Sequence, residues 1–182
     1  MHNQTFDNFI KSESNKYALN VIDELFASIK YGTHLNPLLI YSKTSNGKTH
    51  LLHAIKHKLE SEYPMKTVKY ISPDLFRNEV TKHISADGIT NRILSAIPRL
   101  NLHEFDFLLI DEFQKFPLRE RLLKVLSLEL QKGLRNGQQL IIASTYIPQT
   151  YWAIMETMSE IFKKCSIITL YNLHQNESII KS

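Results

Sequence analysis

The 182-residue chain is 43% hydrophobic and 22% charged, which suits one folded domain with its own core and excludes a disordered or membrane-spanning composition. Its single cysteine, Cys165, excludes an intrachain disulfide framework. Residues 1–5 lack the basic and apolar start of a secretion signal, so we expect a cytoplasmic protein. The net charge of +4 is compatible with a polyanionic partner, although the basic residues are scattered along the chain.

Apolar runs alternate with helical patterns in the first half of the chain. The spacing of apolar residues predicts a helix over 17–29, a strand over 38–41, a helix over 49–62 and a strand over 67–71. Ser72-Pro73-Asp74 is a helix start, because it offers a capping hydroxyl, a proline at the first helical position and an acid near the positive helix end. That helix is expected to run to about His83, and a short one over 89–97 follows the break at Asp87-Gly88.

The second half continues the alternation. The pattern predicts a strand over 107–110, a helix over 118–136 ended by Asn136-Gly137, a strand over 140–143, a helix over 151–163 and a strand over 166–170. Five strands joined by helical crossovers predict an α/β fold with a five-stranded, mainly parallel sheet between helices. Ligands of such sheets bind at the carboxyl ends of the strands.

The strand over 38–41 leads directly into residues 42–49, Ser-Lys-Thr-Ser-Asn-Gly-Lys-Thr, an imperfect phosphate-binding P-loop. In such a loop the backbone amides around Ser45, Asn46 and Gly47 surround a phosphate. The Lys48 ammonium reaches the terminal phosphates, and the Thr49 hydroxyl joins Mg²⁺. The alternative is a simple turn before a helix, with a solvated lysine.

Polar residues also follow two later strands. Asp111 and Glu112 come directly after the strand over 107–110, where Asp111 would hold Mg²⁺ through water and Glu112 would polarise the attacking water. The strand over 140–143 leads into the hydroxyl residues Ser144 and Thr145, and the Thr145 hydroxyl could touch the γ-phosphate or the water. Together with the P-loop, these residues predict a P-loop NTPase site. The alternatives are that the two acids lie in a solvated loop and that Thr145 belongs to an ordinary strand-to-loop transition.

Several stretches together resemble the ATPase domain of bacterial DnaA-type replication initiators and their shorter Hda-like relatives, within the AAA+ class. The most specific is Gly47-Lys48-Thr49-His50-Leu51-Leu52-His53-Ala54. The other matching stretches are residues 5–9, 36–41, 69–72, 107–114 and 144–148. The resemblance implies that ATP or ADP binds with Mg²⁺, that His50 belongs to the binding motif, and that Ile10 and Lys11 lie near the base. It also places the helices over 74–83 and 89–97 at the initiator-specific insertion, where Arg77, Lys82, Arg92 and Arg99 could contact single-stranded DNA.

The chain also departs from that family. Ser42 replaces the first P-loop glycine, and Thr145 stands where initiators usually have an acidic or amide residue. The stretch 157–162 aligns with the family's arginine-rich segment but has no arginine. We expect an N-terminal segment and helix over 1–35, a core over 36–172 and a tail over 173–182 where a helical lid would begin, so that the lid and its sensor 2 arginine are absent.

These features predict a DnaA/Hda-like adenine-nucleotide-binding protein of replication initiation or its regulation, with weak or no ATP hydrolysis of its own. Expected partners are a DnaA-type initiator or another AAA+ replication protein, a sliding clamp or a helicase, and weakly bound single-stranded DNA, with no membrane contact. The alternatives are a helicase-loader-type ATPase and a non-catalytic interaction module with a vestigial P-loop. A zinc site at His53 and His57 is disfavoured because no third ligand is evident.

Overall fold

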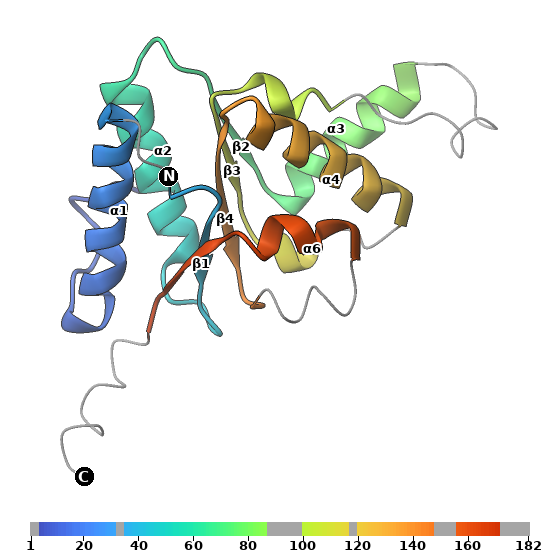
Figure 1. The fold of residues 1–182 in the computed structure, drawn as a ribbon. Coiled ribbons are helices and arrows are strands. Elements are labelled where there is room, and N and C mark those ends of the chain that lie inside the picture. Colours follow the sequence, from blue (N-terminus) through green and yellow to red (C-terminus); the bar gives the residue numbers. More distant parts are fainter. Residues whose placement is uncertain (1–3, 32–34, 87–99, 117–119, 148–155, 172–182) are drawn as a thin grey trace.

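A computed structural model describes residues 4–31, 35–86, 100–116, 120–147 and 156–171. Within them, a central sheet lies between two layers of helices (Figure 1). Its strands are β1 (Leu38–Tyr41), β2 (Val68–Ile71), β3 (Phe107–Ile110), β4 (Gln139–Ser144) and β5 (Ser166–Thr169). The α-helices are α1 (Glu13–Tyr31), α2 (Lys48–Glu62), α3 (Pro73–Ala86), α4 (Glu120–Arg135) and α6 (Glu156–Phe162), and short 3₁₀ turns η1 (Leu102–Glu104) and η2 (Phe113–Lys115) flank β3.

The five strands run parallel in the order β2-β3-β4-β1-β5. Strand β4 therefore lies between β1 and β3, so its carboxyl end separates the P-loop from the acids that follow β3. The predicted α/β fold with a five-stranded parallel sheet is confirmed. The predicted position of Thr145, between the other two strand ends, follows from the same order.

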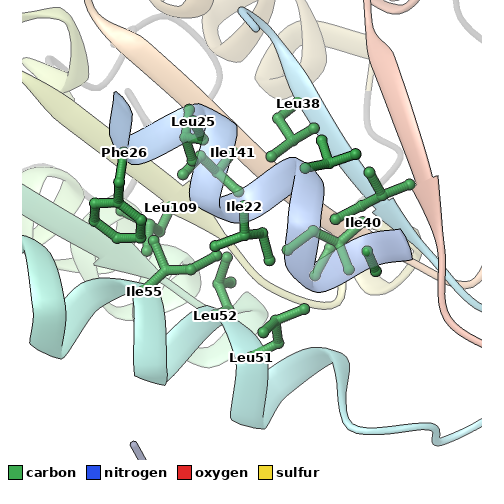
Figure 2. Packing of buried hydrophobic residues seen from close by; sticks show 14 of the residues in the cluster. Ile22, Leu25, Phe26, Leu38, Ile40, Leu51, Leu52, Ile55, Leu109 and Ile141 are labelled. Atoms are coloured by element: carbon green, nitrogen blue, oxygen red, sulfur yellow. The ribbon is translucent and has the colours of Figure 1, made fainter. Parts of the chain in front are cut away.

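The core has one cluster on each face of the sheet. Helices α1 and α2 cover one face, where Ile22 and Ile55 belong to the same cluster as Ile40 (Figure 2). Helices α3, α4 and α6 cover the other, where Leu130 and Ile161 belong to the same cluster as Leu39. Neighbours on β1 enter opposite clusters because side chains alternate across a strand. Both faces are buried, which explains the continuous apolar runs in the sequence.

Most predicted element boundaries agree with the structure within two residues. The strands over 38–41 and 107–110 are confirmed at both ends. Helix α1 begins at Glu13, four residues before the prediction, because Ser12 and Asn15 cap it: the Ser12 backbone N–H donates to Asn15 Oδ1 at 2.9 Å. The helix predicted over 89–97 and residues 151–155 of another lie outside the described residues.

The predicted helix start at Ser72 and helix end at Gly137 are confirmed. The Leu75 backbone N–H donates to Ser72 Oγ at 3.3 Å, and Pro73 is the first residue of α3. Gly137 has a left-handed φ of 83°, and the next amide, Gln138 N–H, donates to Gly133 O at 2.9 Å, the pattern of a Schellman cap. No helix in the described part of the chain is long and apolar enough to span a membrane.

Candidate nucleotide-binding site

The P-loop connects β1 to α2 at the carboxyl edge of the sheet. Gly47 precedes α2 with φ 84° and ψ 14°, a left-handed conformation that favours glycine. A Cβ atom on Gly47 would also lie 3.2 Å from Phe9 Cε2, so a side chain would be crowded as well as strained. No side chain caps the helix, and its first turn carries no acid, so the amides at the start of α2 suit an anion.

Lys48 is buried and turned into the loop. Its Nζ donates to Ser42 O at 3.0 Å and to Thr44 O at 2.7 Å. Burial lowers the pKa of the Lys48 ammonium, and the Asp111 and Glu112 carboxylates oppose that shift. The lysine thus lies in the field of both acids.

Asn46 braces the loop through its side chain. Its Nδ2 donates to Ser42 Oγ at 2.9 Å and to Leu170 O at 3.3 Å, and its Oδ1 accepts from Thr44 Oγ1 at 3.0 Å. The Ser42 that replaces the first P-loop glycine is fully buried and is not among the described residues with positive φ. A serine is therefore tolerated at this position without backbone strain.

Asp111 follows β3 and is 3% exposed. Its Oδ2 accepts from the Tyr70 hydroxyl at 2.9 Å, and its Oδ1 accepts from the Glu112 backbone N–H at 2.8 Å. Burial, reinforced by the charge of Asp111, raises the pKa of the Tyr70 hydroxyl, which therefore remains a donor at neutral pH. The carboxylate is held in one orientation from two directions.

Glu112 has a left-handed φ of 45°, which is uncommon for a residue with a side chain. The turn directs its carboxylate to Lys115, with which it forms an ion pair at the surface. The bond to Glu112 raises the pKa of Lys115. This left-handed turn separates the buried Asp111 from the half-buried Glu112.

The end of β4 joins the other two strand ends. The Ser42 N–H donates to Ser144 O at 3.2 Å, and the Thr145 N–H donates to Gln114 Oε1 at 3.1 Å. Thr145 is half-buried, whereas Ser144 is fully buried and its Oγ accepts from the Tyr146 N–H at 3.0 Å. Thr145 is thus the more accessible of the two hydroxyls.

The N-terminal segment lies against the start of α2. Phe9 contacts Gly47, and its ring meets the His50 ring edge-on at a centroid distance of 5.2 Å. A His50 ring nitrogen, Nε2, lies 2.9 Å from Thr5 O, so this histidine holds the segment in place. Ile10 follows Phe9 and is 68% exposed, which leaves its side chain accessible beside the loop.

Three other predicted residues have less defined surroundings. Ser45 and Thr49 are exposed at the loop and at the first turn of α2. Lys11 is exposed and lines a cavity of about 720 Å³ between the N-terminal segment, α1 and α2, whose lining includes no P-loop residue. Arg77 pairs with Asp74 at 3.1 Å on the surface of α3, while the Lys82 side chain, Arg92 and Arg99 lie outside the described residues.

Sequence reasoning did not identify Tyr70, Gln114 or the packing of Phe9 against the loop. Tyr70 lies one residue before the end of a predicted strand, but its contact with Asp111 depends on the pairing of β2 with β3. The disfavoured zinc site gains no support: in the described ranges no group of three His, Cys, Asp or Glu residues could hold a metal ion.

The residues at this edge fit a magnesium nucleotide. An amine and free helix amides match phosphate oxygens, while a buried carboxylate and an exposed threonine hydroxyl at the start of α2 are oxygen ligands of the kind Mg²⁺ prefers. Lys48, Thr49 and Asp111 would hold the metal and the phosphates. The Lys48 ammonium bonded to two loop carbonyls would exchange these for phosphate oxygens.

Comparison with known proteins identifies relatives of the whole described core. The sequence model of the family described as "Bacterial DnaA ATPase domain" matches residues 1–168. The chromosomal replication initiator protein DnaA of Bacteroides thetaiotaomicron is 32% identical over 162 residues, 88% of this chain and 33% of that protein. The chain therefore spans about a third of the length of this curated relative.

Solved structures share the fold. A replication initiator DnaA bound to AMPPCP and single-stranded DNA matches with a TM-score of 0.77 and 25% identity, over 94% of this chain and 51% of that one. The DnaC helicase loader matches with a TM-score of 0.68 and 17% identity, over 93% of this chain and 98% of that one, a likeness of fold alone.

Proposed function

The chain belongs to the family of bacterial DnaA ATPase domains, and from this premise we propose that it binds ATP or ADP together with Mg²⁺. One observation carries the proposal: Lys48, inside a P-loop with a left-handed Gly47, lies in the field of the buried Asp111. The related DnaA bound to AMPPCP supports the same ligand class.

Each residue would act through the position it occupies. Lys48 would leave Ser42 O and Thr44 O to bind the terminal phosphates, and the amides at the start of α2 would bind the phosphate next to them. Thr49 would bind Mg²⁺ directly and Asp111 would bind it through water, and the bound metal would neutralise phosphate charge. Ile10 and Lys11 would lie near the base.

Glu112 and Thr145 would orient the attacking water. Glu112 pairs with Lys115 in this structure, so it must leave that ion pair before it can reach a water at the phosphate. The Thr145 backbone N–H donates to Gln114 Oε1, and its side-chain hydroxyl would bind the phosphate or the water. Because residues 157–162 contain no arginine, any hydrolysis would be slow unless a partner supplies one to stabilise the transition state.

The biological role we propose is in DNA replication initiation or its regulation, through contact with a DnaA-type initiator or another AAA+ replication protein. The curated relative carries the name chromosomal replication initiator, and a structural relative is bound to single-stranded DNA. For this chain, weak DNA binding, contact with a sliding clamp or helicase, and a cytoplasmic location belong to the same proposal. A helicase-loader role has weaker support, because the likeness to the DnaC loader is one of fold alone.

The test of nucleotide binding is a titration of the protein with a fluorescent ATP or ADP analogue in Mg²⁺. We expect saturable binding, and we expect Lys48→Ala to weaken it at least roughly tenfold, because a charge-assisted hydrogen bond is lost. The matched control is Lys43→Ala, which removes an exposed lysine from the same loop and should leave binding unchanged. Absence of saturable binding at high micromolar protein would instead support the vestigial P-loop.

A further inference from the structure

Tyr70 forms a hydrogen bond with the candidate metal ligand Asp111. Tyr70 lies on the edge strand β2, and its hydroxyl donates to Asp111 Oδ2 at 2.9 Å. Asp111 directly follows β3, the strand that pairs with β2. The other carboxylate oxygen accepts from the Glu112 backbone N–H at 2.8 Å. In the described part of the chain Asp111 forms no ion pair, so these two hydrogen bonds stabilise the negative charge of its carboxylate.

The Tyr70 ring is itself fixed from the other side. Its centroid lies 4.5 Å from that of His53, with the two ring planes inclined by 32°. His53 is four residues after Thr49 on α2, the helix that begins at the P-loop. A series of contacts therefore runs from α2 through Tyr70 to Asp111, linking the phosphate-binding element to the metal-binding strand.

We propose that Tyr70 is a positioning residue for Mg²⁺, which holds the Asp111 carboxylate in its metal-binding orientation before the nucleotide arrives. This inference rests on the proposed nucleotide binding. The last side-chain torsion of an aspartate is broad, so a single donor leaves the carboxylate a wide range of orientations. A second donor from β2 narrows that range, and such partners of a metal ligand typically change metal affinity 10- to 100-fold.

The test is Tyr70→Phe, which removes only the hydroxyl. Binding of a fluorescent ATP analogue is titrated with Mg²⁺, and again in EDTA. We expect the Mg²⁺ concentration at half-maximal binding to rise about tenfold, with binding in EDTA unchanged. A parallel titration with Mn²⁺, followed by the electron paramagnetic resonance of the free ion, should report the same loss of metal affinity directly.

The matched control is Tyr63→Phe, whose hydroxyl donates to Phe26 O at 3.4 Å at the far end of α2. It should leave the Mg²⁺ midpoint unchanged, and thermal unfolding of both variants separates a loss of stability from a loss of metal affinity. Adding Asp111→Asn should abolish the effect of Tyr70→Phe if the hydroxyl acts through that carboxylate.

Two outcomes would overturn the inference in different ways. If the wild-type protein binds nucleotide with a Mg²⁺ dependence that Tyr70→Phe leaves unchanged or strengthens, Tyr70 is not a positioning residue and the proposed function stands. If the wild-type protein binds no nucleotide, the proposed function fails and the role of Tyr70 fails with it.

Discussion

At the scale of single residues, Asn46 and Ser42 form a pair that replaces a usual glycine. A serine at the first P-loop position brings a hydroxyl into a fully buried place, where an unpaired polar group is costly. Asn46 Nδ2 donates to that hydroxyl at 2.9 Å, and the same side chain reaches Thr44 Oγ1 and Leu170 O. The departure from the family pattern at Ser42 is thus accompanied by a partner four residues later.

We predict that Asn46→Ala and Ser42→Ala are coupled in their effects on stability. Asn46→Ala alone should lower the free energy of unfolding by about 1–3 kcal/mol, because it leaves the buried hydroxyl unpaired. In a Ser42→Ala background the same change should cost about 0.5–1.5 kcal/mol less. Urea denaturation of the four proteins measures this coupling, and strictly additive effects would show that the hydrogen bond does not contribute.

At the scale of elements, the end of α4 depends on one glycine. A Cβ atom on Gly133 would lie 2.1 Å from Gln138 Oε1 and 2.8 Å from its Cδ. The Gln138 side chain cannot easily move, because its Nε2 donates to Leu102 O at 2.6 Å and to Phe105 O at 2.8 Å. Gln138 therefore ties the turn after α4 to η1, and Gly133 leaves the room it needs.

We predict that the effect of Gly133→Ala on the free energy of unfolding changes sign when Gln138 is replaced. In the wild-type protein it should lower the free energy of unfolding by about 1–3 kcal/mol, because it forces the buried amide out of place. In a Gln138→Ala background it should raise stability by about 0.5–1 kcal/mol, since alanine is the better helix former. Thermal and urea unfolding measure both values, and destabilisation in both backgrounds would contradict this account.

Among the elements, short buried strands could be predicted from the sequence, whereas contacts between strands could not. Strands β1 and β3 were predicted at both ends because each is a short apolar run directly followed by polar residues, Ser42 or Asp111. The hydrogen bond between Tyr70 and Asp111 was not, because it joins residues 41 positions apart and depends on strand order. The left-handed Glu112 was also missed, because glutamate, unlike glycine or asparagine, has no preference for positive φ that the sequence could show.

At the scale of the whole molecule, the question is whether the protein can turn nucleotide over without a partner. From the family resemblance we expect residues 157–162, most of α6, to align with an arginine-rich stretch that reaches a neighbour's nucleotide, and these residues contain no arginine. An arginine finger raises the rate of phosphoryl transfer about 10³- to 10⁵-fold. Copies of this chain that associate with one another would lack that contribution from this segment.

We therefore predict that the protein alone hydrolyses ATP at a rate on the order of 10⁻³ s⁻¹ or lower. Phosphate release under steady-state conditions measures it, and Lys48→Ala provides the background. An AAA+ partner that supplies an arginine should raise the rate, because Lys48, Thr49, Asp111 and Glu112 remain available on this side of the site. A rate well above the Lys48→Ala background that grows with protein concentration, without any partner, would mean that another residue of this chain acts as the finger.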